Sequence, residues 1–206
     1  MNVRRSLVAG LIGLFVLGTL GAGGLLLISV HQRKLAREFL EEVNSLQLGR
    51  ASLADVQRLA AKYGGRPWNG PSREPTCSYH DCAIRFVFEN KLLAFLPRKR
   101  EMSLAASLTL KDGLVVTKEL DFSLLTTSWT TQFIYVVFDR VSSPAVNGYK
   151  VGKFKIDPSG TAHVVQVELG PTAPPEVRES AYSLDLSCLA RLSGCNTPNA
   201  VFPHGL

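Results

Sequence analysis

The sequence lacks the short motifs that mark the common catalytic sites. Its 206 residues contain no Gly-x-Ser-x-Gly elbow, no phosphate-binding loop, no glycine-rich dinucleotide turn and no His-Glu-x-x-His helix. These absences exclude the enzyme classes that such motifs define. The catalytic alternative that remains is a membrane-tethered hydrolase without a recognisable local motif.

Histidine, the usual acid-base residue of such a hydrolase, is also scarce. The chain has 4 histidines, of which His31 and His204 lie at the membrane edge and in the tail. His80 lies beside a cysteine, and His163 lies in a predicted strand. His163 shares a strand face with three apolar residues, so a core or edge position is favoured over a catalytic one. These three are Val165, Val167 and Leu169.

Charged residues are absent from the 24-residue run between Leu7 and Val30. At 1.5 Å per residue a helix of this length reaches about 36 Å, enough to cross the roughly 30 Å hydrocarbon layer. Fourteen of these residues are Leu, Ile, Val or Phe, and they favour insertion by about 4 to 8 kcal/mol as an upper estimate. The run is longer than the apolar part of a cleaved signal peptide. We therefore predict an uncleaved transmembrane helix over residues 7–30.

The orientation in the membrane depends on the cysteines. Basic residues flank the apolar run on both sides, so their count favours neither orientation. They are Arg4, Arg5, Arg33, Lys34 and Arg37. The 4 cysteines fit a disulfide-forming compartment better than a reducing cytosol. We therefore expect a cytoplasmic tail over residues 1–6, and we expect residues 49–206 to form an extracytoplasmic domain.

Glycines in the predicted span suggest a helix-packing face. Gly10, Gly13, Gly21 and Gly24 fall within about 80° of one another on a helical wheel. Small residues on one face let a second helix approach closely, so pairing with a partner span or a second copy is one hypothesis. The alternative is that glycine is simply commoner in membrane helices.

Two helical patterns precede the predicted sheet. Over residues 31–48, Leu35, Phe39, Val43 and Leu46 recur at helical spacing, so the membrane helix should continue as a juxtamembrane helix. A second helix should begin at Ser52, because Asp55 three residues later completes a capping-box pattern. Its buried stripe is Leu53, Val56, Leu59 and Ala60, and Gly64 and Gly65 should end it.

The start of this second helix resembles part of a known family. Residues 48–56 (LGRASLADV) resemble the Gly-basic-x-Ser/Thr-x-x-acid-Val segment of small outer-membrane lipoproteins of the SmpA/OmlA type. That resemblance implies a role in the assembly of envelope proteins. It covers nine of the 206 residues, and the chain has no lipid-accepting cysteine and no further match. We interpret the segment as a recurring helix-start pattern.

From Cys82 onward the apolar residues alternate with a period of two, which is typical of strands. Lys111-Asp112-Gly113 should form the turn of a hairpin. Residues 133–138 are apolar on both faces, as in a central strand that is covered above and below. A phase shift near Gly152 suggests a bulge, and residues 157–160 should turn the chain into the strand over 162–169. The expected strand faces are Ile84, Phe86 and Phe88; Leu104, Ala106, Leu108 and Leu110; and Leu114, Val116, Leu120 and Phe122.

These patterns predict one α+β domain. The connections between the strands are short, and short connections permit only antiparallel neighbours. We therefore expect a mainly antiparallel meander of six or seven strands with two short helices, the second over residues 183–192. A closed or half-closed barrel is the structural alternative.

The cysteines form the most specific chemical pattern. Cys77 with Cys82 and Cys188 with Cys195 are two close pairs, and we expect two local disulfides. The second bridge requires the helix to end by Gly194, because an intact helix would hold its Cα atoms too far apart. The alternative is a zinc site that includes His80, but a second ligand pair with suitable spacing is missing.

The partners are less well specified. The net charge of +6 is mild despite a basic cluster at residues 98–100, and no aromatic residues are interleaved with it, so we expect no nucleic acid. Trp129, Phe133 and Tyr135 could line a binding face, or simply pack in the core. We expect no metal and no cofactor. The favoured function is a non-enzymatic binding or envelope-assembly module that contacts the lipid bilayer and an envelope protein.

Overall fold

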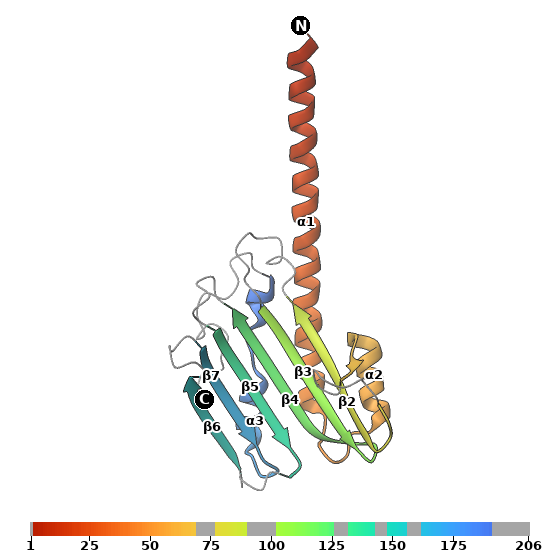
Figure 1. The fold of residues 1–206 in the computed structure, drawn as a ribbon, viewed down its shortest axis with the longest axis vertical. Coiled ribbons are helices and arrows are strands. Elements are labelled where there is room, and N and C mark those ends of the chain that lie inside the picture. The colour runs from red at the N-terminus through yellow and green to blue at the C-terminus, as the bar shows by residue number, and fades with distance from the viewer. Residues whose placement is uncertain are drawn as a thin grey trace.

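The computed structural model describes residues 2–68, 77–89, 102–125, 132–142, 148–155 and 162–190. Over these residues the chain is an α+β protein with a mixed seven-stranded sheet and three α-helices (Figure 1). In chain order the elements are α1 (Asn2–Ser45), α2 (Leu53–Tyr63), β1 (Arg66–Pro67), β2 (Asp81–Glu89), β3 (Met102–Lys111), β4 (Leu114–Leu125), β5 (Gln132–Arg140), β6 (Tyr149–Lys155), β7 (Ala162–Leu169), α3 (Pro175–Tyr182) and the 3-10 helix η2 (Leu186–Ala190).

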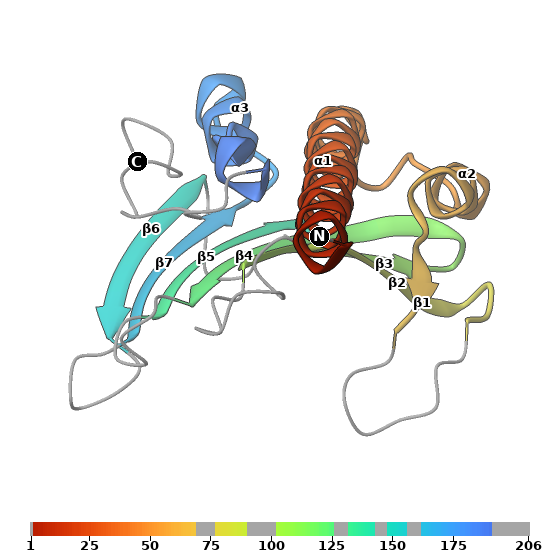
Figure 2. The same ribbon diagram turned by 90° about the horizontal axis from the view of Figure 1, so that it is seen from above.

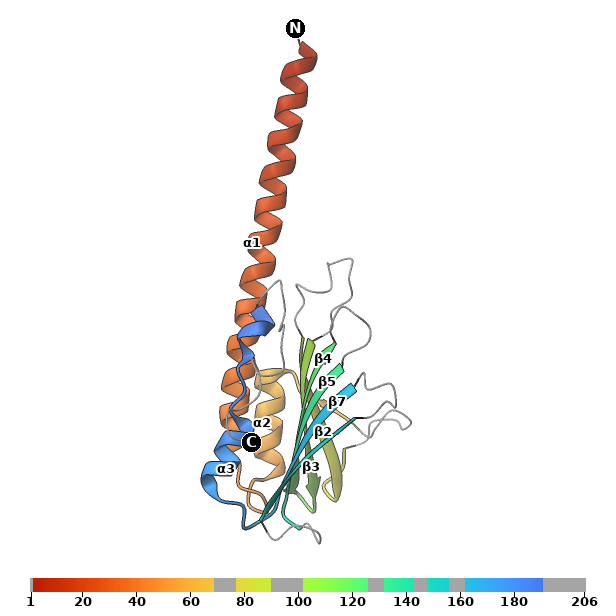
Figure 3. The ribbon, with the colours of Figure 1, turned by 90° about the vertical axis from the view of Figure 1, so that its left-hand side faces the viewer.

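Helix α1 joins the two predicted N-terminal helices into one continuous helix of 44 residues. Its N-terminal half projects away from the sheet, and its C-terminal half packs against it (Figures 1 and 3). Phe39 and Val43 are buried in the core as predicted, together with Ala36 and Leu40. The other two predicted residues, Leu35 and Leu46, are partly buried against the core. The helix ends at Ser45, three residues before the expected end of the juxtamembrane helix.

Among the residues that the structure describes, no helix satisfies the length and apolarity expected of a membrane span. The membrane-spanning role of residues 7–30 therefore stays a prediction.

Helix α2 begins with the predicted capping box. The Ser52 hydroxyl accepts a hydrogen bond from the Asp55 amide, and the Asp55 carboxylate accepts one from the Ser52 amide at 2.9 Å. Gly64 ends the helix in the left-handed conformation at φ 76°, where a residue without Cβ meets no steric penalty. Val56, Leu59 and Tyr63 are buried, so α2 packs its apolar stripe into the core.

Strands β2 to β5 are antiparallel neighbours, as predicted. Asp112 and Gly113 both adopt positive φ, 49° and 75°, which is the type I′ turn that matches the twist of a hairpin. The predicted apolar faces of β2 and β3 are buried. The face of β4 differs, because the register shifts between Thr109 and Leu110. Val115 therefore takes the core position expected for Leu114 and Val116.

The prediction of a simple meander is wrong at the other end of the sheet. The strand order is β1-β2-β3-β4-β5-β7-β6, and β5 and β7 are parallel. A parallel pair needs a connection of a dozen or more residues. Here residues 141–161, which include β6, make that connection, and β6 then lies antiparallel to β7 at the edge. The pairing of β6 with β7 is continuous, so the bulge predicted near Gly152 is also wrong.

All three α-helices lie on one face of the curved sheet (Figure 2). We call this the covered face and the other the open face. On β5, Tyr135, Val137 and Asp139 point to the covered face and are buried. Ile134 and Val136, on the open face, are half-buried. The described helices therefore cover only one face of β5, whereas both faces were expected to be covered.

The last helix differs from the prediction over residues 183–192. The structure places α3 at Pro175–Tyr182, where the proline at the first helical position favours helix initiation. The helix ends at Tyr182, with Ser183 as its C-cap. The Asp185 carboxylate then accepts a hydrogen bond from the Ser187 amide at 2.8 Å, where η2 begins. The predicted turn at residues 157–160 lies outside the described residues.

Candidate functional site

A buried lysine lies where α1 ends against the sheet. Lys118 belongs to β4, and its side chain is 2 % exposed. It lies on the covered face because it precedes Leu120 by two residues, which is the strand period. Its Nζ donates to the carbonyl oxygens of Val43, Asn44 and Leu46, at 3.2 to 3.4 Å. Lys118 therefore donates to carbonyl groups at the end of α1, where a helix leaves carbonyls without intrahelical partners. The Val43 carbonyl also accepts from the Leu46 amide at 3.2 Å.

Asp139 on the adjacent strand β5 balances this charge. Its side chain is fully buried, and Lys118 Nζ lies 3.1 Å from its Oδ2. Arg178 from α3 forms an ion pair with its Oδ1, and Arg178 also donates to the Gly170 carbonyl at 2.9 Å. We call Lys118, Asp139 and Arg178 the ionic cluster. It ties α1, two strands and α3 together.

Burial lowers the pKa of Lys118, while the Asp139 carboxylate acts in the opposite direction. Taking charges out of water is costly unless each has a close partner. The cluster therefore depends on all three side chains being present.

Two tyrosines pack around the ionic cluster. The Lys118 ammonium lies 5.1 Å from the ring centroid of Tyr182, and Tyr135 donates to the Ala181 carbonyl at 2.9 Å. The Tyr182 hydroxyl is buried without a hydrogen-bond partner among the described residues. Burial raises its pKa, and the Asp139 charge acts in the same direction. At neutral pH Tyr182 is therefore a neutral packing residue.

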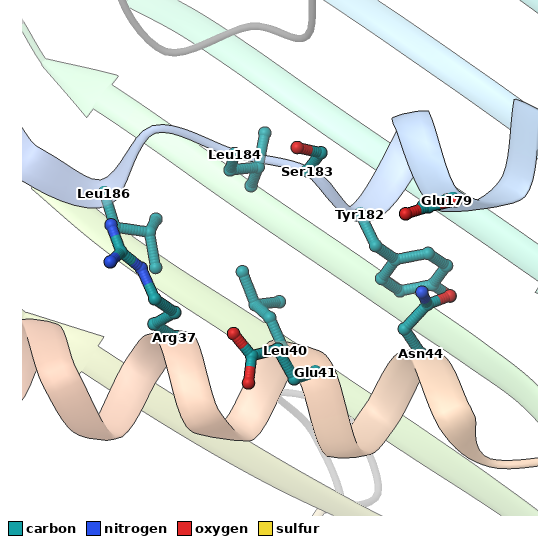
Figure 4. Close-up of a pocket in the computed structure, with 9 residues that line it drawn as sticks. All are labelled: Arg37, Leu40, Glu41, Asn44, Glu179, Tyr182, Ser183, Leu184 and Leu186. Carbon is teal, nitrogen blue, oxygen red and sulfur yellow. The ribbon is translucent and has the colours of Figure 1, made fainter. Parts of the chain in front are cut away.

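Two cavities flank this region, and Asn44 lines both. The first, about 420 Å³, lies between α1 and the α3–η2 segment (Figure 4). Leu40, Leu184 and Leu186 form its apolar part, and charged groups lie around them. These charged groups are Arg37, Glu41 and Glu179.

The second cavity, about 300 Å³, lies where α1 ends. Lys118 and Arg178 line it, together with Arg140 at the end of β5. Asn44 and Gln47 add side-chain amides, and the lining contains no carboxylate. The arrangement is suited to binding, because cations and amides surround a space of small-molecule size.

The two histidines considered for catalysis have ordinary surroundings. The His163 ring is half-buried on β7 and stacks on Phe133, with ring centroids 5.1 Å apart. His80 Nδ1 lies 2.8 Å from Asp112 Oδ1, and both side chains are about 80 % exposed. The thiols nearest to His80 in the sequence both belong to a disulfide, so they supply no nucleophile.

A Cys77–Cys82 disulfide closes a short loop before β2, with Cα atoms 4.3 Å apart. This pairing agrees with the prediction, and it leaves neither thiol to bind zinc. Among the described residues, no group of three or more histidine, cysteine, aspartate or glutamate side chains could hold a metal ion. Cys195 and the Cys188 side chain lie outside the described part of the chain, so that predicted disulfide stays a prediction.

The disulfide loop packs on the β3–β4 turn. The Gly113 amide donates to the Tyr79 carbonyl at 2.7 Å, and the Asp112 amide donates to the His80 carbonyl at 3.2 Å. The Tyr79 ring occupies the position that a Cβ at Gly113 would take. The disulfide therefore fixes a loop that supports the hairpin.

The structure describes two of the three aromatic residues predicted to line a binding face, Phe133 and Tyr135. Tyr135 is buried on the covered face, and Phe133 is half-buried against His163. Trp129 lies outside the described residues. The positions of Phe133 and Tyr135 therefore favour a packing role over a binding role. Sequence analysis missed the ionic cluster, although Lys118 and Asp139 each continue the alternation of an apolar strand face.

Searches with the full sequence and structure find no matching family model, no matching curated protein and no matching solved structure.

Proposed function

We propose that this protein is a single-pass membrane protein with an extracytoplasmic α+β domain that acts as a non-enzymatic binding module in envelope assembly. Helix α1 is the membrane anchor in this proposal, and residues 1–6 are cytoplasmic. The observation that carries the proposal is the change in surroundings along α1, from exposed apolar side chains to core residues.

The exposed part of α1 supports the anchor. Among the side chains that the structure describes between residues 15 and 30, six large apolar ones are at least 45 % exposed, which is an unusual concentration for a surface in water. In lipid the same side chains favour insertion. They are Phe15, Val16, Leu26, Leu27, Ile28 and Val30.

The buried part of α1 supports a rigid connection to the domain. Phe39 packs against the rings of Phe86 and Phe88 with centroids 4.6 and 5.2 Å apart. At its end the same helix is capped by Lys118. A domain joined in this way is held at a fixed height and angle above the membrane, which suits a protein that positions a partner.

The Cys77–Cys82 disulfide supports the extracytoplasmic location, because such bonds persist in oxidising compartments. The glycine face of α1 supports pairing with a partner span or a second copy. A Cβ added at Gly13, Gly21 or Gly24 would meet no atom within 4 Å, so another helix can approach there. Gly10 lies where side-chain surroundings are not described.

Alkaline extraction of membranes tests the anchor. Phe15→Arg combined with Thr19→Arg places two charges near the middle of the span, each costing about 2.5 to 3.5 kcal/mol there. This cost cancels most of the insertion energy, so the variant should appear in the soluble fraction. His31→Arg is the matched control, because an arginine at the edge can extend to the interface. The proposal is wrong if wild type is extracted as readily as the double variant.

A further inference from the structure

We infer that the 300 Å³ cavity at the end of α1 binds a small solute through a phosphate or carboxylate group. We call this cavity the anion pocket. This inference deepens the proposed binding role and rests on it.

The charge around the anion pocket is unbalanced. Lys118 and Arg178 bring two positive charges, and Asp139 is the carboxylate that pairs with both. The carbonyl groups at the end of α1 add roughly half a negative charge. Arg140 adds a third cation to the lining, but its guanidinium lies over the Phe138 ring and interacts with the Glu119 carboxylate, so it contributes only part of its charge. Opposite charges attract strongly in such a partly buried place, so an anion would offset the excess.

Arg178 is the residue that can hold the anion. Lys118 already has four acceptors for its three protons, namely Asp139 and three carbonyl oxygens. It therefore acts through its charge. A guanidinium has five N–H groups, and the contacts described for Arg178 are the ion pair with Asp139 and one bond to Gly170. Its side chain is 23 % exposed and lines the pocket, and its planar group matches an oxyanion.

The position of the anion pocket favours a free solute over a lipid headgroup. Asn44 lies fourteen residues beyond Val30, which is about 21 Å along the helix. The headgroup layer is only about 5 to 8 Å thick on each side. If α1 spans the bilayer as proposed, the pocket therefore lies beyond the headgroups of its own membrane.

Calorimetric titration of the full chain in a neutral detergent tests this inference, with inorganic phosphate and acetate as probes. Sodium chloride keeps the ionic strength constant. We expect saturable binding at one site for at least one probe, and Arg178→Gln should weaken it at least tenfold. Arg58→Gln, which removes an exposed arginine of α2, should leave it unchanged. Absence of binding by wild type, or an equal loss in both variants, would overturn the inference.

A second variant covers the case in which Arg178→Gln fails to fold. Gln47 is exposed and lines the anion pocket without belonging to the ionic cluster. Arg50 donates to the Gln47 Oε1 at 3.2 Å, so Gln47→Glu is combined with Arg50→Gln to leave the added negative charge without this partner. The double variant should bind several-fold more weakly than Arg50→Gln alone. Unchanged affinity in this variant would contradict the inference.

Proteoliposomes distinguish the two sources of the anion. Phosphate affinity should be equal in zwitterionic and anionic lipid. A tenfold loss in anionic lipid would mean that headgroups occupy the pocket, which overturns the free-solute assignment. The titration in detergent does not require a membrane span. A failure of binding therefore leaves the anchor to be judged separately by alkaline extraction.

Discussion

Replacement of Lys118 by methionine tests how α1 is joined to the domain. Methionine keeps most of the apolar length of lysine and removes the ammonium. Asp139 then loses one of its two cationic partners, and the carbonyls of Val43, Asn44 and Leu46 lose the lysine as a donor. The Val43 carbonyl keeps its bond from the Leu46 amide. The contact of the ammonium with the Tyr182 ring, 5.1 Å from the ring centroid, is lost as well.

The expected loss of stability follows from these contacts. Removal of one partner of a buried ion pair costs about 3 to 5 kcal/mol, because a buried charge is left behind. Arg178 still pairs with Asp139, so the lower end of this range applies. With a urea m-value near 2 kcal/mol/M, a loss of about 3 kcal/mol lowers the unfolding midpoint by about 1.5 M.

Urea unfolding of the full chain in detergent, followed by tryptophan fluorescence, measures this shift. Lys62→Met is the matched control, since Lys62 and Glu42 form an ion pair 2.6 Å long with both side chains at least 42 % exposed. Such a pair contributes less than about 1 kcal/mol. Equal midpoints for Lys118→Met and Lys62→Met would refute the structural role of the ionic cluster.

Three further predictions concern other parts of the fold. Gly113→Ala should lower the free energy of unfolding by about 2 kcal/mol, since φ is +75° and the Tyr79 ring fills the Cβ position. Gly152→Ala is the control, because no atom lies closer than 4.0 Å to its Cβ position, and it should cost less than about 1 kcal/mol in the same urea titration. Replacement of both Cys77 and Cys82 by serine should cost about 2 kcal/mol for a loop of this size. A reductant should then shift the unfolding midpoint less than it shifts that of the wild type, because only the predicted Cys188–Cys195 bridge is left to reduce. Burial raises the pKa of Asp121 above 3.8, so its contribution to stability is present below pH 3.8 and is lost as the pH rises through the raised pKa. Asp121→Asn should therefore stabilise the protein at pH 7 and lose this advantage near pH 3. An equal change in the free energy of unfolding at both pH values would contradict the raised pKa of Asp121.

Local signals in the sequence were sufficient for several elements. Ser52 and Asp55 specify the start of α2 because both hydrogen bonds of the capping box are formed within four residues. Asp112 and Gly113 specify the hairpin because few other residue pairs tolerate two positive φ angles. In each case the energy that decides the structure lies between near neighbours in the chain.

The position of β7 could not be found in this way. Its insertion between β5 and β6 depends on the pairing of Tyr135 with Val165 and of Val137 with Val167 across the sheet. Alternation along a strand gives the face of each side chain and says nothing about which strand lies beside it. The prediction assumed that strands joined by a short connection lie side by side in the sheet. In the structure β6 is part of the longer connection that joins β5 to its parallel neighbour β7.

The ionic cluster was missed although its signal is present. Lys118 precedes Leu120 by two residues, and Asp139 follows Val137 by two, so both charges continue apolar faces. Opposite charges at core positions of two paired strands indicate a buried ion pair. Arg178 could not be added from the sequence, because its approach depends on where α3 packs.

The most direct test of the central claim is the thiol state of the protein in isolated membranes, measured by alkylation with a mass-tagged maleimide before and after alkaline extraction. The account predicts that the chain stays in the membrane pellet, and that Cys77 and Cys82 react only after a reductant is added. A chain that is released by alkali, with both thiols alkylated without reductant, would contradict it.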